Sequence, residues 1–226
     1  MSKLILIETS TALCSTALVE DGVISAKRES SEPRAHAAMT AVFVDEMLKE
    51  RGLKVTDCDA VCVSKGPGSY TGLRVGVSTA KGLCFGAGIP LLAVSSLEVL
   101  VAQALAEDAK GYSAIIPVID ARRMEVYSAI FSPEGKQLGE IEATIIDGES
   151  FREQRESGKI LLIGDGAEKC RSVLPDADII QTCPRAEAML VPALREFEAG
   201  HYENTAYFEP FYLKDFVATV SRKKLF

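Results

Sequence analysis

The eleven residues Lys65–Val75, KGPGSYTGLRV, constrain the fold of this chain more than any other stretch. They follow the apolar run Ala60–Val63, which predicts a buried strand, and they lead into a nearly uncharged segment ending near Gly88. A strand, a glycine-rich turn and a helix start direct backbone N–H groups at an anion. A dinucleotide-binding loop would need glycine where Thr71 stands, and a P-loop would end in Gly-Lys-Ser/Thr. The stretch therefore predicts an α/β fold with a turn of another kind.

The composition is that of a globular cytosolic protein. Apolar residues make up 47% and charged residues 25% of the 226 positions, which argues against disorder. The net charge of −7 argues against a broad nucleic-acid surface, which would be basic. No secretory signal precedes Leu4, and no apolar run approaches the ~18 residues that a membrane span needs. The sequence therefore predicts a cytoplasmic protein with no membrane partner.

The cysteines and histidines do not form a recognisable metal or disulfide pattern. The six cysteines contain no Cys-x-x-Cys pair, and most fall in apolar runs, where a free thiol behaves as a small hydrophobic group. Disulfides are uncommon in a cytosolic protein of this size. The two histidines, His36 and His201, lie far apart in sequence. We therefore expect no bound metal.

The sequence of the first half predicts strands and helices before and after the glycine loop. Strands are expected at 4–7, 14–19, from 23 onward, at 60–64 and at 91–94, and Asp21-Gly22 is a hairpin signal. Helices are expected at 33–51, at 71–88 and at 97–106. Ser95 and Glu98 predict a capping box for the last of these helices.

The order of elements then starts again. Strands are expected at 114–119, 125–131, 140–146 and 161–163, and the turn Gly164-Asp165-Gly166 precedes another helix. Glu8 and Asp120 fall at equivalent strand ends. The order predicts an internal duplication of two mixed sheets flanked by helices, with subdomains at 1–108 and 109–226. The alternative is that such a repeated order of strands and turns occurs in any α/β protein, without a duplication.

The helices expected at 33–51 and 71–88 have more apolar surface than one sheet can cover. Small residues recur every fourth position along one side of the second helix, which favours close approach of another backbone. One interpretation is burial beneath the second half of the chain. The other is a protein–protein interface. The residues assigned to that interface are Ala37, Ala41, Val44, Leu48, Gly72, Gly76 and Ala80.

No set of residues predicts a catalytic centre. Nucleophilic catalysis would need Ser or Cys beside a histidine and an acid, and no Gly-x-Ser-x-Gly motif is present. The candidate nucleotide or phosphate contacts are Gly66, Gly68, Ser69 and Thr71. Ser69 and Thr71 have an alternative role as N-caps of the following helix. Glu8 and Asp120 stand where a kinase of the actin-like class places metal-binding carboxylates, or they accept hydrogen bonds in turns.

Four stretches resemble one family. They are the opening LILIETS, the loop GPGSYTGLRVG at 66–76, IDARRMEVY at 119–127 and the late Tyr212-Leu213, and together they resemble the TsaB family, also called YeaZ. The similarity runs from Leu4 to about Lys224. It implies an actin-like fold of the ASKHA type, with two ribonuclease-H-like halves.

The resemblance also implies a role and partners. Members of the family belong to the bacterial complex that makes threonylcarbamoyladenosine in tRNA, next to the anticodon. The paralogue TsaD transfers the threonylcarbamoyl group, and the ATPase TsaE supports turnover. The implied chain is a scaffold that docks TsaD, or a second copy when alone, and reaches tRNA through the complex. No intrinsic cofactor is expected, and ATP and a metal ion are expected on the partner subunits.

At two positions the sequence differs from related proteins in a way that affects metal or nucleotide binding. TsaD carries two metal-binding histidines four apart on its first helix, whereas here Thr40 stands four residues after His36. Glu8 replaces the aspartate usual in the family, which leaves open any nucleotide role of that turn. Two alternatives are kept: an ATP-dependent phosphotransferase using Glu8 or Asp120, and a peptidase-like hydrolase. Possible phosphate contacts to tRNA lie at Lys214, Arg222, Lys223 and Lys224.

Overall fold

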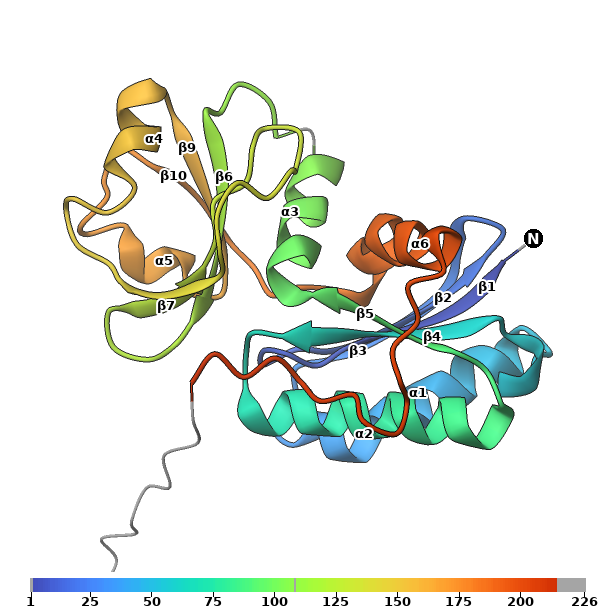
Figure 1. The fold of residues 1–226 in the computed structure, drawn as a ribbon. Helices are drawn as coiled ribbons and strands as arrows, with labels where there is room; N and C mark the ends of the chain where they lie inside the picture. The colour runs from blue at the N-terminus through green and yellow to red at the C-terminus, as the bar shows by residue number, and fades with distance from the viewer. Residues whose placement is uncertain (1, 108, 215–226) are drawn as a thin grey trace, which may run out of the picture.

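A computed structural model describes residues 2–107 and 109–214 and divides them into two parts, each built on a sheet (Figure 1). The first described sheet has five strands in the order β3-β2-β1-β4-β5. Their bounds are β1 Lys3–Glu8, β2 Cys14–Glu20, β3 Val23–Ser30, β4 Ala60–Gly66 and β5 Leu91–Ser95. The parallel strands β1 and β4 are buried on both faces, which explains their continuous apolar sequences.

The second sheet repeats the first. In the described chain its five strands follow the order β10-β9-β6-β7-β8. The bounds are β6 Ala114–Asp120, β7 Glu125–Ser128, β8 Glu142–Ile145, β9 Ile160–Gly164 and β10 Asp178–Gln181. In each half the first three strands pair antiparallel, and the fourth and fifth add in parallel. The predicted duplication is confirmed, and Glu8 and Asp120 do end equivalent strands.

The helices of the two halves differ in length. Helices α1 (Ala35–Glu50) and α2 (Tyr70–Ala87) lie side by side on one face of the first sheet (Figure 1). Their equivalents in the second half are only α4 (Arg152–Ser157) and α5 (Ala167–Cys170). The surplus apolar helix surface therefore belongs to the first half alone.

The other face of the first sheet is covered by helices from both halves of the chain. Helix α3 (Ser96–Ala106) lies between the sheets, with Val99 in the core of the first and Leu100 in the core of the second. The 3-10 helix η2 (Ala186–Met189) and α6 (Leu190–Ala199) return from the second half to pack on β1. The five strands of each sheet come from one half of the chain, while η2 and α6 pack against the other half. The subdomain boundary expected at 108/109 stays a prediction.

Several predicted local details differ from the structure. Strand β7 ends at Ser128 instead of 131, and the chain beyond it makes only isolated bridges at Phe131. Ser95 caps α3 through the N–H of Leu97 at 3.2 Å, whereas Glu98 pairs with Arg195, so the predicted reciprocal capping box does not form. The remaining short helix in the first half is η1 (Val55–Asp57). Within the described residues, no helix combines the length and apolar character needed to cross a bilayer.

Candidate functional site

A cleft of about 640 Å³ opens where the carboxyl ends of β1 and β6 face each other. Both halves of the chain line it, together with the C-terminal strap, which we define as residues 203–214. The lining residues used below are Ser10, Thr11, His36, Gly68, Ser69, Tyr70, Thr71, Asp120, Arg122, Asp165, Tyr212 and Lys214. In open α/β sheets, ligands bind at the carboxyl ends of strands, so this cleft is the candidate site.

The glycine loop is pressed against the turn that follows β1. A Cβ atom added at Gly68 would lie 2.3 Å from the carbonyl oxygen of Ser10, and the N–H of Ser69 donates to that oxygen at 2.7 Å. The Ser69 hydroxyl accepts from the N–H of Gly72 at 3.3 Å, so Ser69 is the N-cap of α2. Thr71 lies inside the helix, so its alternative role as an N-cap is wrong.

Three of the four candidate phosphate contacts reach the cleft. Gly68, Ser69 and Thr71 line it. Gly66 is buried below, where Leu73 and the carbonyl group of Phe211 surround it. Binding of phosphate by these residues stays a prediction.

The carboxylates near the cleft are engaged within the chain. Glu8 is completely buried, and its Oε1 accepts from the N–H of Ser10 at 2.6 Å. Asp120 pairs with Lys169 and accepts from the N–H of Arg122 at 2.7 Å. Asp165 accepts from the N–H of Asp120 at 3.0 Å. Each of the three carboxylates therefore accepts a hydrogen bond from a backbone N–H of this chain.

Protonation of these groups follows from their surroundings. Burial raises the pKa of Glu8 to about 7, because hydrogen bonding near Ser10 and Ser64 compensates only in part. Its Oε2 and both serine hydroxyls have no partner with standard geometry. Partial burial alone would raise the pKa of Asp120, but Lys169 and the N–H of Arg122 outweigh it and lower that pKa. Burial raises the pKa of Asp165.

Glu8 gives the chain a pH-dependent stability. Below pH about 4.5 the carboxyl group is protonated in both states, and between about 4.5 and 7 only the folded state keeps the proton. Stability therefore falls as pH rises through this window, by about 3 kcal/mol in total. Glu8→Gln, which resembles the protonated acid, is expected to remove this loss. Urea unfolding of both proteins from pH 5 to 8 measures it, and parallel pH profiles would contradict a raised pKa.

His36 lines the cleft, but Thr40 is not available beside it. The Thr40 hydroxyl donates to the carbonyl oxygen of His36 at 2.6 Å and lies 3.4 Å from the sulfur of Cys14. His201 contacts Glu196 at 2.9 Å near the end of α6. In the described part of the chain, no three His, Cys, Asp or Glu residues lie close enough to share a metal ion.

The predicted partner interface needs correction. Val44, Leu48 and Ala80 are buried together with Val77 where α1 packs on α2. Gly72 and Gly76 are also buried, because Thr9 lies against them: an added Cβ would meet its carbonyl oxygen at 2.1 Å and its hydroxyl at 2.2 Å, respectively. The small residues admit this chain's own first turn rather than a partner.

Only Ala37 and Ala41 of the predicted set are exposed. They belong to a wider surface that the sequence interpretation missed, which we call the uncovered helix face. Its residues are Ala37, Ala38, Ala41 and Val42 of α1 with Thr71, Val75, Ser78, Gly82 and Phe85 of α2. Phe85 is 87% exposed. The available signal was Phe85 close to the small residues Gly82, Gly86 and Ala87 near the end of the helix.

The C-terminal strap was also missed as part of the cleft. The N–H of Phe211 donates to the carbonyl oxygen of Lys65 at 2.7 Å, and the Tyr212 ring lies 4.8 Å from that of Tyr70. Lys214 pairs with Glu125, which joins the strap to the second half. The other predicted tRNA contacts, Arg222, Lys223 and Lys224, lie outside the described residues.

A family model and two curated proteins match most of this chain. A family model described as "TsaD: tRNA N6-adenosine threonylcarbamoyltransferase" matches residues 30–221. The "tRNA threonylcarbamoyladenosine biosynthesis protein TsaB" of Escherichia coli K12 is 32% identical and covers 96% of this chain and 96% of its own length. The chain belongs to the TsaB family. The TsaB protein of Haemophilus influenzae is 31% identical over 98% of this chain and 96% of its own.

Solved structures extend the comparison for this TsaB-family chain. YeaZ from Pseudomonas aeruginosa matches with a TM-score of 0.81 at 26% identity, covering 94% of this chain and 100% of that one. The activator of 2-hydroxyisocaproyl-CoA dehydratase from Clostridium difficile has a TM-score of 0.52 at 11% identity, covering 88% and 96%, and shares the fold alone. The predicted ASKHA fold with two duplicated halves is confirmed.

Proposed function

We propose that this chain is a non-catalytic scaffold subunit of the bacterial complex that forms threonylcarbamoyladenosine in tRNA. Its TsaB relatives carry that biosynthesis in their names. In this proposal the chain works in the cytoplasm and pairs with TsaD. It supports transfer of the threonylcarbamoyl group to the adenosine next to the anticodon, while TsaE drives turnover. A second copy of the chain occupies the same surface when TsaD is absent.

The observation that carries the proposal is the uncovered helix face. Among the described residues, α1 and α2 lie on the side of the first sheet opposite α3 and α6, and the C-terminal strap crosses α2 there (Figure 1). Lys81 holds the strap through the carbonyl oxygens of Ala206 and Phe208 at 3.1 and 3.0 Å. The strap leaves Phe85 and Val42 in solvent. Exposed apolar side chains on neighbouring helices are typical of an interaction surface, so Phe85 and Val42 among small residues fit a helical partner, with Asp45 and Arg74 exposed beside them.

The cleft supports the non-catalytic part of the proposal. Glu8 is enclosed, and the Asp120 carboxylate is held by Lys169. The hydroxyl of Thr40 is used on its own helix. These contacts leave the residues at kinase-like and TsaD-like positions occupied by structural bonds. ATP and the metal ion are therefore assigned to the partner subunits.

Reconstitution tests this function. Added to TsaD and TsaE, the chain is expected to be required for tRNA modification, and His36→Ala is expected to keep that activity within about twofold. The reason is that the proposed scaffold role depends on pairing through the uncovered helix face and not on the His36 imidazole. Radiolabelled threonine in tRNA measures it. Full modification without the chain would end the scaffold proposal.

Calorimetry with Mg-ATP on the isolated chain separates the alternatives. Micromolar binding with turnover would favour the phosphotransferase. Peptide cleavage that disappears in His36→Ala would favour the hydrolase.

A further inference from the structure

The beginning of the C-terminal strap is anchored on the first half by several kinds of contact. The N–H of Glu203 donates to the carbonyl oxygen of Leu91 at 2.8 Å, on the edge strand β5. Lys81 donates to the carbonyl oxygens of Ala206 and Phe208. The Phe208 side chain also packs against the core between α1, α2 and the first sheet. As far as Phe208, the strap is therefore part of the first half.

The end of the strap is held more lightly and reaches the other half. None of residues 209–214 is buried. Phe211 and Tyr212 contact the first half through one backbone hydrogen bond and one stacked ring. Lys214 then forms an ion pair with Glu125 of β7, which belongs to the second half. The strap thus passes from one half to the other along the cleft that residues 211–214 help to line (Figure 1).

Helix α3 joins the halves where the two sheets meet. Val99 packs in the core of the first sheet and Leu100 in the core of the second. Gln103 donates to the Thr182 hydroxyl at 2.9 Å at the same junction. Rotation of the halves about α3 changes the width of the cleft and leaves both sheets intact, as in hinge motions of other two-part proteins. The strap and β7 belong to the two bodies that such a rotation separates.

The ion pair that ends the strap is well placed but weak. The Lys214 side chain is 44% exposed and that of Glu125 21% exposed. Exposed ion pairs contribute little free energy and weaken further in salt. The backbone of Glu125 is fixed, because its carbonyl oxygen accepts from Lys169 at 2.6 Å and Lys169 pairs with Asp120 in the cleft. A weak contact on a fixed position can open and close again in the same place.

We propose that residues 209–214 form a latch on the cleft. The Lys214–Glu125 pair holds the halves closed, and its release lets them separate and admit a ligand. The width of the cleft is then controlled by one exposed ion pair, whereas the cores of both halves stay as they are. The latch is a property of the isolated chain and does not depend on the proposed scaffold role.

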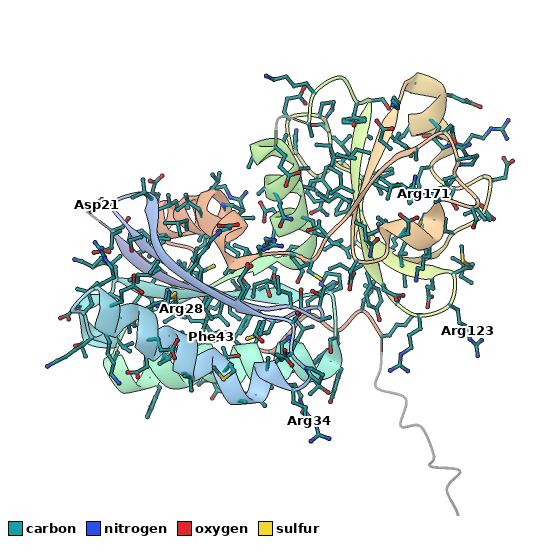
Figure 2. All side chains as sticks on the ribbon, turned by 180° about the vertical axis from the view of Figure 1, so that it is seen from behind. Asp21, Arg28, Arg34, Phe43, Arg123 and Arg171 are labelled. Atoms are coloured by element: carbon teal, nitrogen blue, oxygen red, sulfur yellow. The ribbon has the colours of Figure 1, made fainter. Side chains whose placement is uncertain are left out.

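The test measures the distance between the halves of the full chain by double electron–electron resonance. Arg34→Cys and Arg171→Cys carry the spin labels, because both side chains are exposed and project from different halves (Figure 2). Cys183→Ser removes the cysteine that is not buried. Labelled chain is diluted into unlabelled chain, so that self-association adds no distances.

Lys214→Gln and Glu125→Gln are each expected to raise the ratio of separated to closed chains about threefold at low salt, the size of effect that an exposed ion pair allows. In about 1 M KCl the original chain is expected to match both variants, because salt screens the pair. The reversed pair Lys214→Glu/Glu125→Lys is expected to restore the original distribution of distances, since it keeps the attraction.

Lys159→Gln is the matched control. It breaks the Lys159–Asp178 ion pair, which is also exposed but lies within the second half. This change is expected to leave the distances between the halves as they are. The latch is wrong if Lys214→Gln gives the distances of the original chain, if Lys159→Gln has an equal effect, or if the reversed pair fails to restore them.

Discussion

Gly72→Ala is expected to lower the free energy of unfolding by about 3 kcal/mol, which corresponds to a Tm lower by roughly 10 °C. The added Cβ would stand 2.1 Å from the carbonyl oxygen of Thr9. That oxygen belongs to the backbone at the end of a central strand, so it cannot rotate away as a side chain would. The Thr9 hydroxyl also donates to the carbonyl oxygen of Gly72 at 2.9 Å, and this bond is strained by any shift of the helix.

Gly82→Ala in the same helix is the matched control. Gly82 is exposed, and nothing lies within 4 Å of an added Cβ. Because alanine loses less backbone entropy in a helix, this change is expected to stabilise the chain by about 0.5–1 kcal/mol. Urea unfolding of both variants gives the comparison. Equal effects of the two changes would mean that Thr9 does not lie against α2 as described.

Phe85→Glu is expected to weaken pairing with TsaD at least about 30-fold without destabilising the chain, because truncating a central aromatic contact typically costs 2 kcal/mol or more. The ring is 87% exposed on α2, so its removal leaves no cavity in the monomer. The new carboxylate would be buried against a partner, and Lys81, one helical turn earlier, already donates to the strap carbonyl oxygens of Ala206 and Phe208. Titration calorimetry with TsaD measures the pairing, and light scattering follows self-association in its absence.

Val191→Glu controls for charge and exposure. Val191 is 71% exposed on α6, which lies across the first sheet from α2. Pairing is expected to be unchanged in this variant. If both variants pair as tightly as the original chain, the uncovered helix face is not the partner surface. If both weaken it equally, the effect is one of net charge.

The strands and helix boundaries could be predicted because their causes are local. Leu4–Ile7 and Ala60–Val63 are continuous apolar runs, and such runs form strands buried on both faces wherever they pair. Ser69 caps α2 through a hydrogen bond that spans three residues. The repeated order of these signals was enough to predict two halves. That Gly68 and Asp120, one from each half, line one cleft was not predicted and comes from the structure.

Which side of each helix is buried against a neighbour, and which is exposed, could not be predicted in the same way. Ala37 and Leu48 lie on one stripe of α1, yet the first is exposed and the second is buried against α2. A periodic pattern defines which residues share a side, but not which neighbour that side meets. The glycine stripe shows the same limit, because a close backbone contact looks identical in sequence whether it is made within the chain or with a partner.

By itself, the sequence determined the element order, the duplication, the helix cap at Ser69 and the family, because each depends on residues close together in the chain or on a shared motif. Only the tertiary structure decided that Thr9 fills the small-residue stripe, that Phe85 is left outside and that Glu8 is enclosed. These facts depend on contacts between segments tens of residues apart, and no local pattern encodes such distances.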